Sequence, residues 1–128
     1  MVTTIPAEIL HLGDAQGTIK ESGLGDLIAI RDTGQDPADR LHMLSMNEIE
    51  LVMIGGRVQL ATEAVFARLP LAARRGLEPI SIDGLMRWLR APVQALLHRA
   101  EDVLGRGEVH LGGRRICIPV GLEAAHAC

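Results

Sequence analysis

Two pairs of adjacent glycines constrain the fold of this chain more than any other feature of its sequence. Each pair separates two short runs that are rich in aliphatic and β-branched residues. The pairs are Gly55 and Gly56, between residues 49–54 and 57–60, and Gly112 and Gly113, between residues 108–111 and 114–118. A two-residue turn with positive φ joins antiparallel strands, and glycine adopts that φ without steric cost. The sequence therefore predicts two β-hairpins. They resemble each other as an internal repeat would, although we favour the simpler interpretation that both use the same turn chemistry.

Short strands and helices are expected around the first hairpin. Residues 18–19 and 27–30 are predicted strands, and four consecutive apolar residues at 27–30 indicate burial on both faces of a sheet. Asp36 followed by Pro37 is typical of a helix start, as cap and first helical residue. Thr4 is the expected cap of an N-terminal helix. Further short elements are expected downstream: a helix capped by Thr62, a helical turn at 71–75 and a strand at 79–82.

The longest helical pattern occupies residues 85–104, with Asp83 as its expected cap. Its apolar residues recur at the helical period and are Leu85, Trp88, Leu89, Val93, Leu96, Leu97, Ala100, Val103 and Leu104. Pro92 removes a backbone hydrogen bond, so we expect a kink or a new helix start near Ala91. The predicted fold class is α+β and mainly β, with antiparallel hairpins packed against this C-terminal helical segment.

Composition limits the function classes that the chain can serve. Hydrophobic residues make up 48% of its 128 residues and aromatic residues only 2%, so the core must be aliphatic. The net charge is −3 without a basic face, which argues against nucleic-acid binding. No apolar run approaches the roughly 20 residues that span a bilayer, and the N-terminus lacks the pattern of a secretory signal. We therefore expect a cytoplasmic protein of one domain, without a membrane partner.

Residues 17–60 resemble a known family. They contain G-T-I-K-E-S-G-L-G-D-L, an apolar strand, a loop with an Asp-Pro pair, and V-M-I-G-G-R-V. This order is similar to the C-terminal β-sandwich segment of the amidohydrolase superfamily, in which the segment follows a metal-dependent TIM barrel. Residues 2–10 resemble the helix that leads out of that barrel. The resemblance is good over residues 2–60 and fainter over 61–118, and Gly25 stands where the family usually has alanine.

The resemblance implies an incomplete composite β-sandwich and a division of the chain into three parts. Residues 1–61 correspond to the composite-domain segment, 62–118 to a C-terminal extension in the same compact unit, and 119–128 to a tail. The intact enzyme would hydrolyse C–N bonds of amides or cyclic amides with a hydroxide bound to a divalent metal such as zinc. This chain would supply no catalytic, cofactor or metal-binding residue, and its partner would be the missing barrel.

The residues themselves indicate no local catalytic site. The five histidines have none of the spacings of a metal motif and are His11, His42, His98, His110 and His126. We expect His110 to point outward from a strand, and Cys117 to be a buried, unreactive thiol between isoleucines. Asp26 has the better case for a structural role, binding backbone amides of the Gly23–Gly25 turn, than for catalysis. The roles of His98 and His110 stay open.

An alternative function needs no barrel. The chain would then be a stand-alone β-module that binds another protein or itself, because an incomplete sheet leaves unpaired strand edges and an uncovered apolar face. Both features favour homo-oligomers, a dimer first among them.

Overall fold

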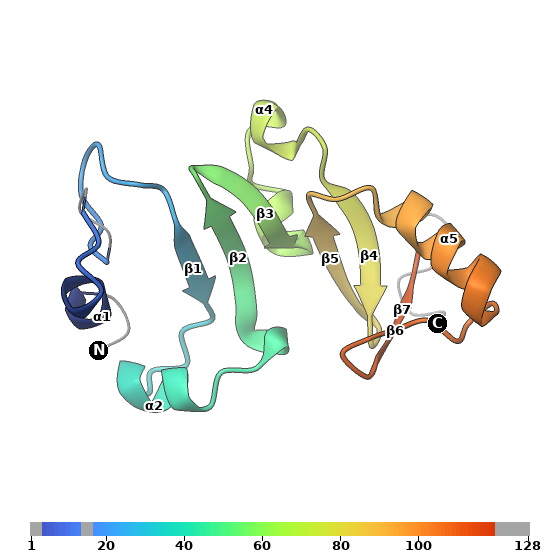
Figure 1. Cartoon of the computed structure of the whole chain (residues 1–128), viewed down its shortest axis with the longest axis horizontal. Helices are drawn as coiled ribbons and strands as arrows, with labels where there is room; N and C mark the ends of the chain where they lie inside the picture. Colours follow the sequence, from blue (N-terminus) through green and yellow to red (C-terminus); the bar gives the residue numbers. More distant parts are fainter. Residues whose placement is uncertain (1–3, 14–16, 120–128) are drawn as a thin grey trace.

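The computed structural model describes residues 4–13 and 17–119 of the chain. Within these residues, seven strands form one antiparallel sheet in the order β1-β2-β3-β5-β4-β7-β6 (Figure 1). The strands are β1 (Leu27–Ile30), β2 (Ile49–Ile54), β3 (Arg57–Thr62), β4 (Glu78–Ile82), β5 (Leu85–Leu89), β6 (His110–Leu111) and β7 (Arg114–Cys117). The helices are α1 (Thr4–Ile9), α2 (Pro37–His42), the short 3-10 helix η1 (Met46–Glu48), α3 (Glu63–Phe66), α4 (Leu71–Arg74) and α5 (Val93–Leu104). The α+β class with a substantial antiparallel sheet is confirmed.

Both glycine-pair hairpins form as predicted. In the β2–β3 hairpin, Ile54 lies opposite Arg57, and the turn residues Gly55 and Gly56 have φ of 57° and 71°. In the β6–β7 hairpin, Leu111 lies opposite Arg114, with two positive-φ glycines again in the turn. Positive φ at both central positions gives the turn a twist that matches the flanking strands, which is why two glycines specify it so well.

The start of the predicted 85–104 helix is wrong. Residues Leu85–Leu89 form β5, which pairs with both β3 and β4, and α5 begins only at Val93, directly after Pro92. Asp83 is not a helix cap but the first residue of a two-residue turn with Gly84, and both have positive φ. An Asp-Gly pair between apolar runs is a strong hairpin signal. The apolar residues 85, 88 and 89 also fit a helical period, and that coincidence hid the strand.

Three other expectations need correction. Residues 18–19 lie outside any strand. β1 is not buried on both faces, because it is an edge strand of the sheet and its Ile28 is 59% exposed. Cys117 is disulfide-bonded and half-buried rather than a buried free thiol; the other cysteine of the chain, Cys128, lies outside the described residues.

The predicted helix caps at Asp36 and Thr62 are confirmed. The Asp36 carboxylate accepts a hydrogen bond of 2.8 Å from the backbone N–H of Ala38 at the start of α2. The Thr62 hydroxyl accepts one of 3.4 Å from Val65 at the start of α3. Thr4 is the first residue of α1 rather than its cap. These side-chain bonds satisfy amides that lack partners within the helix.

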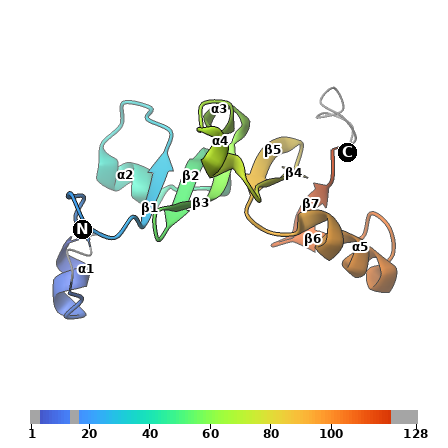
Figure 2. The same ribbon diagram turned by 90° about the horizontal axis from the view of Figure 1, so that it is seen from above.

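The hydrophobic core is divided between the two faces of the sheet. Trp88 and Leu89 are neighbours on β5, so their side chains point to opposite faces. Trp88 packs with Val58, Ala61 and Leu77, and its ring stacks on Phe66 of α3 with 3.7 Å between centroids. Leu89 packs on the other side with Ile80, Ile82, Ile116 and Val93 of α5. Figure 2 shows α3 and α4 on one side of the sheet and α5 on the other.

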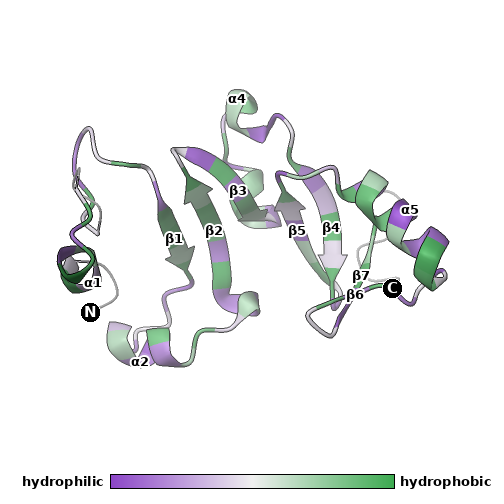
Figure 3. Ribbon diagram, viewed as in Figure 1, coloured by the Kyte–Doolittle hydropathy of each residue, from purple (hydrophilic) through white to green (hydrophobic). Residues whose placement is uncertain are grey.

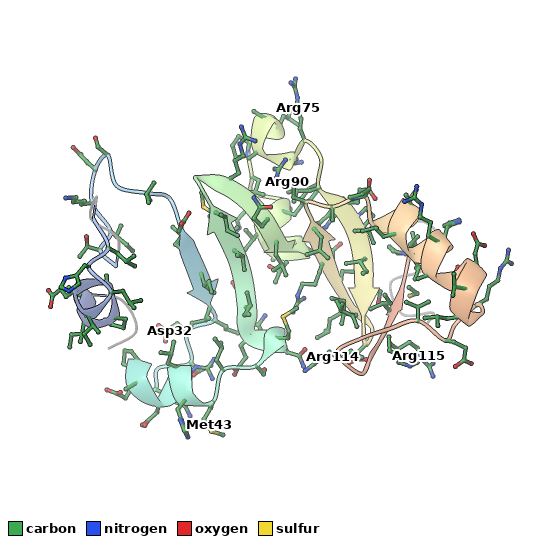
Figure 4. The ribbon with its side chains drawn as sticks, in the orientation of Figure 1. Asp32, Met43, Arg75, Arg90, Arg114 and Arg115 are labelled. Carbon is green, nitrogen blue, oxygen red and sulfur yellow. The ribbon has the colours of Figure 1, made fainter. Side chains whose placement is uncertain are left out.

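Arg90 joins the first half of the chain to the second. Its guanidinium donates to three backbone carbonyls: Val58 in β3 at 2.6 Å, Ala73 in α4 at 2.9 Å, and Arg75 just after α4. Figure 4 shows Arg90 below α4 and Arg75 beside the upper end of that helix. A planar group with five donors suits this role, because it can satisfy several carbonyls that would otherwise be left without partners.

Candidate functional site

Two distant parts of the segment that carries the family resemblance contact each other at the turn between β2 and β3. The backbone N–H of Gly56 donates to the carbonyl of Gly25 at 3.1 Å. Next to it, the carboxylate of Asp26 accepts a hydrogen bond of 2.5 Å from the N–H of Gly55. We call this contact the Gly25–Gly56 joint, defined by Gly25, Asp26, Gly55 and Gly56. Asp26 therefore has the structural role that the sequence indicates, with the β2–β3 turn as its partner instead of the turn at residues 23–25.

The joint is too close for any side chain at position 25. A Cβ on Gly25 would lie 2.7 Å from both Cα and N of Gly56, and real Cβ atoms essentially never approach other atoms within 3.0 Å. The resembled family usually has alanine at position 25. Glycine stands here instead because the two backbones are in contact and leave no room for a Cβ.

A second polar cluster surrounds Asn47 in η1. The Asn47 carbonyl accepts a hydrogen bond of 3.2 Å from Arg87, and its side-chain oxygen accepts one of 3.0 Å from Arg114. Arg114 also forms an ion pair of 3.3 Å with Asp83. Arg87 is only 7% exposed, and its burial lowers the pKa of the guanidinium. The cluster ties η1 to β5 and β7, and Figure 4 shows Arg114 pointing toward η1 and away from Arg115.

An open hollow of about 440 Å³ lies at the end of the sheet beside this cluster. It is lined by Asp83, Gly84, His110, Gly113 and Arg115. His110 is exposed, as expected, and its Nδ1 lies 2.9 Å from the carbonyl of Glu108. The Arg115 backbone N–H donates to the Asp83 carboxylate at 2.9 Å, so that carboxylate is occupied by β7. The hollow holds one carboxylate, one imidazole and one guanidinium, without a nucleophile beside a base.

His98 lies in a second open hollow, of about 350 Å³, on the solvent side of α5. Glu101, Asp102 and Arg106 line it with His98. Residues three and four apart share a helix face, which explains why these polar side chains are neighbours. The arrangement is that of a solvated helix face.

The described histidines are not brought together by the fold. His11 follows α1, His42 ends α2, His98 is in α5 and His110 is in β6, whereas His126 lies outside the described residues. In residues 4–13 and 17–119, no three His, Cys, Asp or Glu side chains are grouped so that they could hold a metal ion. The donor set of the described chain therefore does not fit a zinc site.

Three polar residues that tie distant segments together were not singled out by sequence reasoning. Arg87 and Arg90 appear in the sequence as two charges on the polar face of a helix, and Asn47 as a loop residue. Arginine is mostly exposed in proteins, so nothing in its immediate neighbours indicated burial. The missed signal is again the Asp-Gly pair at 83–84: a strand at 85–89 places Arg87 within a sheet.

Comparisons with known proteins give no further lead. No family model matches the chain, and neither the curated proteins nor the solved structures include a match. None of the helices in the described part of the chain is long and apolar enough to cross a membrane.

Proposed function

We propose that this chain is the non-catalytic C-terminal portion of an amidohydrolase-like enzyme, and that its sheet scaffolds a catalytic barrel supplied by the rest of that enzyme. The Gly25–Gly56 joint is the observation that carries the proposal. The joint holds the segment with the family resemblance together as one structural unit. β1 pairs with β2, with Leu27 opposite Met53, and Asp26 ties the start of β1 to the β2–β3 turn. A motif whose distant parts bind one another has a structural reason to occur as a whole.

Apolar surface at the N-terminal side of the sheet supports the same proposal. On α1, Ile9 is 70% exposed and Leu10 is 66% exposed, and Ile28 on β1 is 59% exposed. Figure 3 shows strong hydrophobic colour on β1, the last strand at this end of the sheet, and on α1 beyond it. β1 has a single strand neighbour among the described residues, so its outer edge is available to another strand. Strands and a barrel contributed by the parent enzyme would cover this surface. Burying it would stabilise the assembly by about 25 cal/mol for each Å² of apolar area.

The chemistry of the proposal lies outside the described residues. The parent enzyme would hydrolyse C–N bonds of amides or cyclic amides, and a divalent metal such as zinc would supply the nucleophilic hydroxide. Because the described donor set does not fit a zinc site, we assign no step of that reaction to this chain. Its contribution is to fix the position of the exit helix and the sheet against the barrel.

The experiment compares this polypeptide with the native one. An antibody against the chain is used to purify the native protein from its source, and both are assayed on a panel of amides and cyclic amides, with zinc and with a chelator. We expect zinc-dependent hydrolysis by the native protein and none by the 128-residue chain. Zinc-dependent hydrolysis by the isolated chain, or a native protein that is inactive and lacks a barrel, would contradict the proposal.

A second candidate is a stand-alone module for protein interaction or self-association. The observation that favours it is exposed apolar surface at the other end of the molecule, on α5, where Val103 is 83% exposed. This surface lies in the extension, where the family resemblance is faint.

A further inference from the structure

The hollow of about 440 Å³ at the end of the sheet is framed by two hairpin turns from different parts of the chain. Asp83 and Gly84 form the β4–β5 turn, and Gly113 belongs to the β6–β7 turn. Two hydrogen bonds of 2.9 Å join the turns: the Asp83 N–H donates to the Arg115 carbonyl, and the Arg115 N–H donates to the Asp83 carboxylate. Figure 1 shows the two turns side by side at the lower end of the sheet. The side chains that line the hollow therefore project from a fixed frame.

Two of these side chains can carry positive charge. His110 and Arg115 lie directly opposite each other on the β6–β7 hairpin, and both line the hollow. Directly opposite residues of an antiparallel pair share one face of the sheet, with Cβ atoms about 4.5–5.5 Å apart. Like charges in this arrangement repel each other. A negatively charged ligand between the two side chains would replace that repulsion by two attractions.

The guanidinium of Arg115 is available to such a ligand. The side chain is exposed, and among the described residues it has no hydrogen-bond or ion-pair partner. Its neighbour Arg114, by contrast, is paired with Asp83 and bound to Asn47. A guanidinium presents its N–H donors as a planar fork that fits two oxygens of one phosphate or carboxylate group. Arg115 can therefore supply two of the hydrogen bonds that hold an anion.

The imidazole of His110 is oriented by the backbone. Its Nδ1 lies 2.9 Å from the carbonyl oxygen of Glu108. A carbonyl only accepts hydrogen bonds, so Nδ1 carries a proton, and Nε2 is left for another partner. An anion beside the ring favours the imidazolium form, in which Nε2–H is also a donor. His110 can therefore supply a third hydrogen bond.

The carboxylate of Asp83 does not cancel the positive charge of the hollow. It forms an ion pair of 3.3 Å with Arg114, and it accepts the backbone N–H of Arg115. Its own charge is balanced by Arg114, which leaves the charge of the Arg115 guanidinium for a ligand. The hollow as a whole therefore favours an anion.

We propose that this hollow binds a phosphate group, held by two hydrogen bonds from the Arg115 guanidinium and one from Nε2 of His110. Phosphate fits better than carboxylate because it offers a third oxygen to the imidazolium after the guanidinium has bound two. A volume of about 440 Å³ falls within the range of roughly 300–1,000 Å³ for small-molecule sites, so the organic part of a phosphate monoester has room as well. The inference does not rest on the proposed function, since the hollow lies outside residues 2–60, which carry the family resemblance.

The test is an NMR titration of the full chain, labelled with ¹⁵N, at constant ionic strength. The probes are inorganic phosphate, glycerol 3-phosphate and acetate. We expect both phosphates to shift the amide signals of Gly84 and Gly113 with a dissociation constant of about 10⁻³ M, and acetate to bind more weakly by about fivefold or more. Tighter binding of glycerol 3-phosphate than of inorganic phosphate would assign the site to phosphate monoesters, and equal binding would assign it to free phosphate.

Two substitutions remove the proposed ligands of the phosphate. We expect Arg115→Gln to weaken phosphate binding by about tenfold or more, and His110→Gln by about fivefold. The matched control is Arg106→Gln, which removes the same charge from the second hollow, and we expect it to bind phosphate like the wild type. All three side chains are exposed, so the fold should be kept. Unchanged amide signals away from the substituted residue would verify this in each variant.

Four results would each overturn the proposal. The first is that the signals of Gly84 and Gly113 do not move up to about 20 mM phosphate, roughly twenty times the expected dissociation constant. The second is that acetate binds as tightly as phosphate. The third is that Arg115→Gln or His110→Gln binds phosphate like the wild type, and the fourth is that Arg106→Gln weakens binding as much as Arg115→Gln does. None of these results depends on the presence of a barrel.

Discussion

Replacement of Gly25 by alanine tests the Gly25–Gly56 joint directly. The new Cβ would lie 2.7 Å from the Cα and N of Gly56, whereas ordinary contact begins at 3.4 Å. The β2–β3 turn must therefore move away by about 0.7 Å, the difference between these two distances. A shift of that size lengthens the Gly56-to-Gly25 backbone hydrogen bond beyond its present 3.1 Å and strains the bond from Gly55 to Asp26.

The magnitude follows from these two bonds. A backbone hydrogen bond contributes about 1 kcal/mol net, and one to a charged group about 1.5–3 kcal/mol. The bond to Asp26 is exposed, so its contribution falls at the lower end of that range. Alanine offsets about 0.4–1 kcal/mol of this loss, because it restricts the conformations of the unfolded chain more than glycine does. We expect Gly25→Ala to reduce the free energy of unfolding by about 2 kcal/mol, and to lower the urea midpoint by about 1 M.

Gly13→Ala is the matched control for this measurement. A Cβ at position 13 meets nothing within 4 Å, so only the unfolded-state effect of alanine remains. We expect this variant to be as stable as the wild type or slightly more so. A Gly25→Ala variant that unfolds at the wild-type urea midpoint would refute the close contact, and would show that the alanine usual in the resembled family fits here as well.

Three further substitutions test other parts of the fold. Arg90→Lys keeps the charge but cannot reach three carbonyls at once, so we expect the free energy of unfolding, measured in urea, to fall by about 2 kcal/mol. The control Arg68→Lys, at an exposed position, should cause no loss, and equal effects of the two substitutions would show that the three bonds contribute nothing. Ser81 is 1% exposed and its hydroxyl has no partner among the described residues, so Ser81→Ala should be neutral or stabilising by up to about 1 kcal/mol; a clear loss would reveal a partner for that hydroxyl. The pKa of Glu48 is lowered by hydrogen bonds from the Ser45 backbone and from Arg40, so its carboxylate stabilises the fold above its unfolded-state pKa, and that stabilisation is lost as the pH falls through the lower, folded-state pKa. Glu48→Gln should therefore be less stable than the wild type at pH 7, with the difference shrinking toward pH 3 in urea titrations; a difference that is the same at both pH values would contradict this assignment.

Local turn and cap chemistry made part of the fold predictable. Gly55 with Gly56, and Asp36 with Pro37, act through backbone conformations and hydrogen bonds formed within a few residues. Such signals do not depend on the rest of the molecule, and both were confirmed.

The missed features depend on contacts between distant segments. β5 pairs with the distant β3 as well as with the adjacent β4. The turn at Asp83 and Gly84 signals the pairing with β4, but no property of residues 85–89 indicates the pairing with β3. Ile28 is exposed because β1 is the last strand of the sheet, which follows from strand order and not from the apolar run itself. Tertiary pairing overrode the helical period in the first case and the expected burial in the second.

The candidate site was less predictable than the fold. Asp26 was assigned a structural role from its place before a strand, yet its partner Gly55 lies 29 residues away. Arg87 and Arg90 bind carbonyls of segments that are 40 and 32 residues distant. Their sequence neighbours are those of surface charges, so burial could be inferred only after β5 was known to be a strand.

The most direct test of the proposed function is the intact mass of the native polypeptide that contains this sequence, measured by mass spectrometry after purification from its source. The account predicts a mass several times the 13.8 kDa of this chain, with a barrel sequence bearing a His-x-His pair upstream of residue 1. A native mass equal to that of this chain would contradict the account and favour the stand-alone interaction module.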